Sequence, residues 1–188
     1  MNELKRNLSM KTLKYAILGL LAQQDMTGYE LMKQFESTLC EFWSATHSQI
    51  YPELKKLTDE GNVKYQVEIS GTVLEKKVYS ITDIGRADFL NWLSEDVKMA
   101  ATPKDVFRLK VFFSGALEPQ LRLKHLKNQL TQHEHRLSHL KGNQQKFSGI
   151  PDSASHEFGD YLVLMGAIMR EEMNCEWLRK CIALCENN

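Results

Sequence analysis

The sequence predicts a mainly α-helical fold with one small β-hairpin. Three observations lead to this fold class. Residues 46–81 have the pattern of an amphipathic helix, a glycine stop and two strands rich in β-branched and aromatic residues. Apolar residues at helical spacing mark further helices on both sides of this stretch. Prolines and capping residues stand between the apolar segments, where helices begin and end.

Composition restricts the class of protein. A chain of 188 residues with 43% hydrophobic and 26% charged residues is typical of a globular protein with one or two domains. No apolar run reaches the roughly 20 residues that span a bilayer. The basic, apolar N-terminus is not followed by a small-residue cleavage site, so we expect a cytoplasmic protein.

The four cysteines include no CxxC pair, which argues against a zinc ribbon or a thioredoxin-like site. We interpret them as buried free thiols. Redox sensing by the three cysteines near the C-terminus, Cys175, Cys181 and Cys185, is the alternative.

The first two helices are predicted from apolar spacing and from a capping motif. The first runs from about Met10 to Gln23, and its inner face carries Leu13, Ile17, Leu20 and Leu21. Thr27 and Glu30 have the spacing of a capping box, which opens a second helix from Gly28 to about Leu39. Its inner face carries Leu31, Phe35 and Leu39, and Phe42 and Trp43 are expected to fill the connection that follows.

The third helix has a clear inner and outer side. Ile50, Leu54 and Leu57 recur at helical spacing and can face a core, which leaves Ser48, Gln49, Lys55 and Lys56 outside. Pro52 bends a helix when it lies past the first turn. The helix therefore begins either near Ser48, or near Thr46 with a kink. Gly61 is expected to end it.

A hairpin of Val63–Ser70 and Val73–Ile81 follows, joined through residues 70–72. A helix that can enter the major groove, followed directly by a hairpin, is the layout of a winged helix-turn-helix. DNA reading is therefore the leading hypothesis. Residues 1–95 hold 11 Lys and Arg against 13 Asp and Glu, a net charge of −2, so any basic patch must come from placement. The basic residues available for it are Lys5, Arg6, Lys11, Lys14, Lys55, Lys56, Lys64, Lys76 and Lys77.

A change in organisation is expected near residue 98. Thr82 can cap a helix with an apolar stripe of Phe89, Leu90, Leu93 and Val97, and residues 99–102 have the character of a linker. Pro103 and Pro119 each suit the first position of a further helix. We therefore predict a winged helix-turn-helix DNA-binding domain over residues 1–98 and a helical dimerisation domain over residues 99–188.

Two long helices are predicted in the second domain, one from Pro119 to about Lys146 and one from about His156 to Cys185. The first has apolar residues at heptad spacing, and the second is apolar on more than one side, as expected for a helix buried between two partners. A homodimer is therefore expected. The residues assigned to dimerisation are Leu123, Leu126, Leu130, His133, Leu137, Tyr161, Met165, Ile168 and Trp177.

Several segments together resemble the PadR family of transcriptional regulators. They are TLKYAILGLLAQQDMTGYEL, FWSATHSQIYPELKKLTDEGNV and KKVYSITDIGRADFLNWL. The segments LKVFFSG and GAIMREEMNCEWL are similar to the virulence-activator-type helical domain of that family. This resemblance implies a bacterial transcriptional regulator, expected to be a repressor, that binds a pseudo-palindromic promoter site as a homodimer.

The residues assigned to DNA contact combine the resemblance with the outward face of the third helix. Gln49 can form a bidentate contact with adenine, and Ser48 can contact a base or a phosphate. The full set is Lys11, Tyr15, Thr27, Tyr29, Ser48, Gln49, Tyr51, Pro52, Lys55, Lys56, Lys76, Lys77 and Tyr79.

Other functions are weighed against this one. The alternative is a winged-helix module that binds protein, or senses redox state or a ligand, without reading DNA. His135 and His139 have the spacing of a chelating pair, but no third ligand is evident, so we predict no metal and no cofactor. No phosphate loop or nucleophile motif is present, so an enzyme is not expected. A small-molecule effector remains open, because family members differ in this respect.

Overall fold

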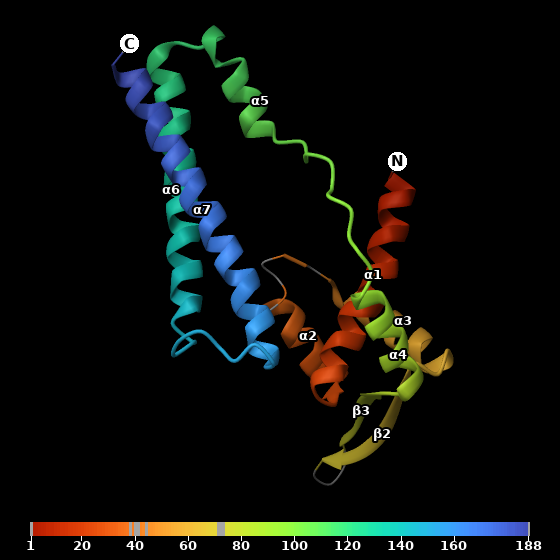
Figure 1. Ribbon diagram of the computed structural model, residues 1–188. Coiled ribbons are helices and arrows are strands. Elements are labelled where there is room, and N and C mark those ends of the chain that lie inside the picture. Colours follow the sequence, from red (N-terminus) through yellow and green to blue (C-terminus); the bar gives the residue numbers. More distant parts are fainter. Residues whose placement is uncertain (1, 38, 40–41, 44, 71–73, 188) are drawn as a thin grey trace. The chain divides into compact units, whose positions relative to one another are not determined.

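The computed structural model describes residues 2–37, 39, 42–43, 45–70 and 74–187 (Figure 1). The side chains of residues 2–11, 69, 70 and 74 are outside this description. The chain divides into two compact units, Met1–Lys98 and Met99–Asn188. Most of the described residues lie in helices, and a small antiparallel sheet lies in the first unit, which confirms the predicted fold class.

The described part of the first unit contains four helices and a three-stranded sheet. The helices are α1 (Asn2–Gln23), α2 (Gly28–Ser37), α3 (His47–Asp59) and α4 (Asp83–Leu93). The strands are β1 (Met26–Thr27), β2 (Val63–Ser70) and β3 (Leu74–Ile81), in the antiparallel order β1-β3-β2. The predicted hairpin is present as β2 and β3, and its connecting residues 71–73 lie outside the described part of the chain.

The core of the first unit is built from the predicted inner faces of α1, α2 and α3. Ile50, Leu54 and Leu57 of α3 are completely buried, as is Leu31 of α2, and Phe35 is 2% exposed. The four residues predicted for the inner face of α1 are buried too, together with Leu18, which was not predicted. Trp43 and Leu39 pack against this core, whereas Phe42 is 54% exposed and does not fill the connection as predicted.

Local hydrogen bonds explain where α2 begins and where α3 ends. The backbone N–H of Thr27 donates to Glu30 Oε2 at 2.8 Å, and the Glu30 N–H donates back to Thr27 Oγ1 at 3.2 Å, which confirms the predicted capping box. Helix α3 ends where Gly61, at φ 75°, lets the Asn62 N–H donate to the Leu57 carbonyl at 2.9 Å.

The start of α3 decides between the two alternatives left open by Pro52. Thr46 is the N-cap, so the helix begins at His47 and continues through Pro52. Proline has no N–H to donate to the carbonyl four residues earlier, so one hydrogen bond of the helix is lost at that point. The helix tolerates the proline because its inner residues on both sides, Ile50 and Leu54, are fully buried.

Helix α4 is rotated differently from the prediction. Thr82 does cap it, accepting from the Gly85 N–H at 3.1 Å. Leu90 and Leu93 are 55% and 60% exposed, and Val97 lies beyond the helix, so the predicted apolar stripe is wrong at these positions. Close approach of Gly85 to the Asn62 carbonyl sets the rotation, so that Phe89 and Trp92, four and seven residues after Gly85, face α1. The rings of Trp92 and Tyr15 stack at 4.5 Å.

The second unit contains α5 (Val106–Phe112), a short 3-10 helix η1 (Ser114–Ala116), α6 (Pro119–Gln144) and α7 (His156–Glu186). Helices α6 and α7 lie side by side along their length (Figure 1). Pro119 opens α6 as predicted. Pro103 does not open α5, because the Asp105 carboxylate caps that helix by accepting from the Arg108 N–H at 2.9 Å.

The heptad residues of α6 pack against α7 of the same chain. Leu140, Leu164, Ala167 and Ile168 form one apolar cluster. Leu126, Leu178 and Ile182 form another. Leu126 and Ile168 were assigned to dimerisation from the sequence but are buried within the chain, because a heptad pattern predicts a packed face without identifying its partner. Partly buried side chains from the same assignment pack against these clusters too: Leu123, Leu130, Leu137 and Trp177.

A buried polar cluster separates the two apolar clusters. His133 Nδ1 lies 2.5 Å from Glu171 Oε2, and Arg136 Nε lies 3.6 Å from Glu171 Oε1. Only 4% of Glu171 is exposed. His133, which was assigned to dimerisation, is therefore paired with a carboxylate on α7, and this pairing compensates the cost of burying the Glu171 charge.

Candidate nucleic-acid interface

The outward face of α3 carries the polar residues predicted for it. Ser48, Gln49 and Lys55 are exposed, and Tyr51 is 38% exposed, on the side of the helix opposite to its buried leucines. A helix that is anchored by one apolar face and open on the other can be inserted into a groove without unfolding its own unit. The local arrangement needed for a reading helix is therefore present.

Gln49 has a local role that was not predicted, although Thr46 and Gln49 have the spacing of a capping box. Its amide oxygen Oε1 accepts from both the N–H and the hydroxyl of Thr46, each at 3.0 Å, and the Thr46 hydroxyl also lies 2.9 Å from Ser48 Oγ. A bidentate contact with adenine uses the amide oxygen and the amide nitrogen together. In this conformation Gln49 can offer only its amide N–H₂ group to a base, so reading adenine requires the cap to open.

Tyr51 and Tyr29 are exposed near the contact between α2 and α3. The ring of Tyr51 lies directly on Gly28, where an added Cβ would be only 2.8 Å from Tyr51 Cε1. His47, one turn earlier on α3, packs against the same ring at 4.4 Å. Tyr29 follows Gly28 and is 60% exposed. His47 was missed by the sequence reasoning, although its i, i+4 spacing from Tyr51 is a usable signal.

The two lysines of α3 differ in their surroundings. Lys56 Nζ lies 3.7 Å from Glu53 Oε1 and 3.9 Å from Glu60 Oε1, so two carboxylates share its charge. Lys55 has no ion-pair partner among the residues whose side chains are described. Since a phosphate contact requires an ammonium group that is not already neutralised, Lys55 is the stronger candidate of the two.

The β2–β3 hairpin, which is the wing of this fold, presents one lysine on each face. Neighbouring residues of a strand point to opposite faces, so Lys76 and Lys77 cannot contact the same phosphate. Lys77 Nζ lies 4.2 Å above the ring of Tyr65 on the partner strand. Tyr79 is buried in the core, and burial raises the pKa of its hydroxyl, so its assignment to the DNA-contacting surface is corrected.

Other residues assigned to DNA contact have structural roles in the first unit. Tyr15 stacks on Trp92, and burial followed by the charge of Asp88 raises its pKa. The Thr27 side chain is used in the capping box of α2. Pro52 is exposed on α3. The Lys11 side chain lies outside the described residues.

Two of the three described cysteines are in surroundings that disfavour the thiolate. Cys175 is fully buried, and burial raises the pKa of its thiol and that of the partly buried Cys181. Cys40 lies outside the described residues. Within the described ranges, no group of three or more His, Cys, Asp or Glu side chains is placed to hold a metal ion. No helix in that part of the chain is both long enough and apolar enough to span a bilayer.

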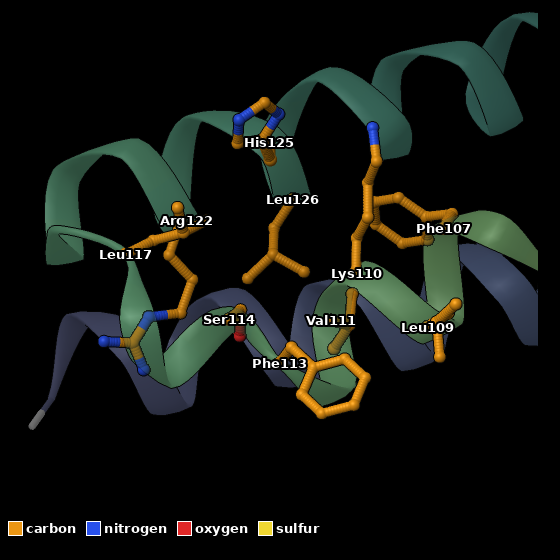
Figure 2. A pocket seen from close by; sticks show the side chains of 10 residues that line it. All are labelled: Phe107, Leu109, Lys110, Val111, Phe113, Ser114, Leu117, Arg122, His125 and Leu126. Atoms are coloured by element: carbon orange, nitrogen blue, oxygen red, sulfur yellow. The ribbon is translucent and has the colours of Figure 1, made fainter.

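The second unit contains a cavity of about 460 Å³ between α5, η1 and the start of α6 (Figure 2). Its walls are mainly apolar, with Phe107, Val111 and Leu126 among them, and its polar side chains include Arg122 and His125. Arg122 Nε is buried and has no hydrogen-bond partner among the described atoms. A cavity of this size and lining suits a small amphipathic anion.

The anchored helix α3, the preceding α2 and the β2–β3 wing together define a winged helix-turn-helix protein. Two family models match the chain: the transcriptional regulator PadR-like family over residues 17–91 and the virulence activator alpha C-terminal domain over residues 103–186. The chain is 43% identical to the negative transcriptional regulator PadR of Bacillus subtilis, over 95% of this chain and 100% of the relative. It is 30% identical to the probable transcriptional regulator Rv1176c of Mycobacterium tuberculosis, over 88% and 93% of the two chains.

Solved structures agree with these matches. The structure of Bacillus subtilis PadR in complex with operator DNA superposes with a TM-score of 0.87 at 42% identity, covering 93% of this chain and 99% of that one. The structure of the same regulator in complex with p-coumaric acid has a TM-score of 0.82 at 40% identity, covering 93% and 98%. The chain belongs to the PadR-like family of transcriptional regulators, which confirms the resemblance found in the sequence.

Proposed function

We propose that this chain is a homodimeric repressor that binds a pseudo-palindromic promoter site through α3 and the wing. The observation that carries this proposal is the exposed polar face of α3 on a helix whose other face is fully buried. The complex of the 42%-identical Bacillus subtilis regulator with operator DNA supports it. Such a role has no catalytic step, and its target DNA lies in the bacterial cytoplasm.

Each contact has a chemical role in this proposal. Ser48 and the amide N–H₂ of Gln49 lie in the first turn of α3, where a reading helix meets base edges. Lys55 and the hydroxyl groups of Tyr29 and Tyr51 are placed to meet phosphates, which fix the register of the protein on the duplex. Lys76 or Lys77 adds a contact from the wing.

The second unit is proposed to join the two subunits. Helix α7 buries one face against α6 but leaves a second apolar stripe exposed, formed by Leu162, Met165, Met169 and Met173. These positions are spaced by three, four and four residues and therefore share one helix face. A continuous apolar face on a regulator that acts on a two-fold symmetric site is best covered by a second copy. Met165 thus keeps its proposed dimer contact.

The effector is proposed to be an aromatic carboxylic acid of the p-coumaric acid type. The Bacillus subtilis relative is known in complex with that compound. In this chain, the cavity beside Arg122 has apolar walls and a guanidinium group, which is the chemistry that such an acid needs. Adding p-coumaric acid to a preformed protein–DNA complex should release the DNA. An Arg122→Gln variant that responds at the same concentration would place the acid elsewhere in the chain, whereas a complete lack of response in the wild type would contradict the effector proposal.

The DNA-binding proposal is tested with a duplex selected from a random pool by the full-length protein. Lys55→Ala should weaken binding to selected and unrelated duplexes alike. It should also lower the slope of log affinity against log salt by about 1, as expected for the loss of one phosphate contact. Ser48→Ala should mainly reduce the preference for the selected duplex. Lys180, which pairs with Glu176 on α7, gives a matched control, and Lys180→Ala should change neither quantity. Failure to enrich any duplex would refute the proposal.

A further inference from the structure

Helix α2 presents a lysine next to the reading helix that the assignment of DNA contacts did not include. Lys33 is exposed, and its Nζ lies 5.2 Å from the centre of the Tyr29 ring, one turn earlier on the same helix face. Leu31 and Phe35 lie on the opposite side of the helix and are buried, so the face with Tyr29 and Lys33 points outward. The exposed Tyr29 ring therefore restrains the ammonium group through a cation–π contact.

The charge of Lys33 is not neutralised by an ion pair with a neighbouring carboxylate. Glu30 and Glu36 are the acids nearest in sequence, three residues away on either side, and neither forms an ion pair with Lys33. Glu30 Oε2 instead accepts from the Thr27 N–H at 2.8 Å and from the Thr27 hydroxyl at 2.9 Å. These two hydrogen bonds, of which the one from the backbone has the larger effect, lower the pKa of Glu30. They also hold its carboxylate at the start of the helix. Within the described side chains Lys33 has no ion-pair partner, in contrast to Lys14, whose Nζ lies 2.6 Å from Asp88.

The start of α2 adjoins the outward tyrosine of α3. Gly28 lies under the ring of Tyr51, and Tyr29, the next residue, begins the exposed face of α2 close to this contact. In a helix-turn-helix, the helix before the reading helix crosses the DNA backbone. A restrained, unpaired ammonium on that helix is therefore placed over phosphates rather than over base edges.

We propose that Lys33, held against the ring of Tyr29, is a further contact of α2 with the DNA backbone. This inference rests on the proposed DNA-binding function. One phosphate contact contributes about 0.9 to the slope of log affinity against log salt. Loss of such a contact should therefore weaken binding about eightfold at roughly 0.1 M salt, equally for the selected duplex and for an unrelated one.

The test measures fluorescence anisotropy of the full-length protein on a selected duplex across a potassium chloride series. Lys33→Gln should lower the slope by about 0.9, Lys33→Arg should restore it, and Lys180→Gln should leave it unchanged. Thermal melting of each variant checks that the fold is intact. A wild-type slope in Lys33→Gln would overturn the inference while leaving DNA binding established. Absence of sequence-preferring binding in the wild type would instead refute the proposed function.

Discussion

Replacing Gly28 with alanine should separate DNA affinity from stability. A Cβ at this position would lie 2.8 Å from Tyr51 Cε1 and 3.0 Å from its Cζ and Oη. Carbon atoms in contact prefer at least about 3.5 Å, so the ring must move by roughly 0.7 Å or more. The displaced atoms form the far end of a side chain that is 38% exposed, so the ring can move outward without disturbing the core.

The two expected effects have opposite signs. Alanine in place of glycine near the start of α2 stabilises the helix by at most about 1 kcal/mol, because the unfolded chain loses conformational freedom. Displacing Tyr51 should remove its proposed hydrogen bond to the DNA backbone, worth about 1.4 kcal/mol, which corresponds to about tenfold weaker binding. The melting temperature should thus stay the same or rise while the dissociation constant for a selected duplex increases about tenfold.

Gly85→Ala is the matched control, because its Cβ would meet backbone instead of a side chain. It would lie 2.1 Å from the Asn62 carbonyl oxygen, which also accepts from the Thr82 N–H at 3.0 Å. Forcing these atoms apart should cost about 2–4 kcal/mol of unfolding free energy. Urea unfolding and anisotropy on both variants measure the two quantities. Equal loss of stability in both, or full affinity in Gly28→Ala, would refute the reasoning.

Three further predictions concern other polar groups of the two units. His133→Leu should lower the free energy of unfolding by about 1–3 kcal/mol in urea, because it leaves the buried Glu171 short of a partner. A variant with leucine at both positions should recover that loss. Equal stability of the two variants would contradict this prediction. Gln49→Ala should lower the free energy of unfolding by about 0.5–1 kcal/mol, because the cap of α3 is lost. It should also weaken discrimination between duplexes, and an unchanged preference would exclude Gln49 from base reading. Because hydrogen bonds from Thr27 lower the pKa of Glu30 below 4.5, the stability that they contribute is present above pH 4.5 and lost as the pH falls through the lowered value. Urea unfolding from pH 7 to pH 3 should show a smaller decrease for Thr27→Val than for the wild type, and identical decreases would argue against this linkage.

Local patterns predicted the parts of the fold that depend on neighbours in sequence. The buried face of α3 follows from the spacing of three apolar residues, and its end follows from the need for a residue at positive φ, which Gly61 meets. The capping box of α2 is likewise a four-residue signal. Such features could be read correctly because each depends on contacts within one or two helical turns.

Contacts between distant residues could not be predicted in the same way. Strand β1 has only two residues, and it exists because Met26 and Thr27 pair with Tyr79 and Val78 of β3. The rotation of α4 depends on the close approach of Gly85 to Asn62, which no periodicity reveals.

The candidate site shows the same division. The outward direction of Ser48 and Lys55 could be predicted from spacing. The burial of Tyr79 depends on which neighbours the fold brings to its side chain. The capping contact of Gln49 and the contact of Lys33 with Tyr29 each lie within one helical turn, so their spacing was a usable signal that was not used. Heptad spacing on α6 identified a packed helix face correctly, but only the structure assigned that face to α7 of the same chain.

Hydroxyl-radical footprinting of the full-length protein on a selected duplex tests the central claim most directly. Two copies of α3 entering successive major grooves should protect two patches of backbone, with centres about one helical turn, roughly 10 base pairs, or a multiple of it, apart. Lys55→Ala should weaken both patches together. A single protected patch, or a footprint that is unchanged in Lys55→Ala, would contradict the assignment of α3 as the reading helix of a symmetric dimer.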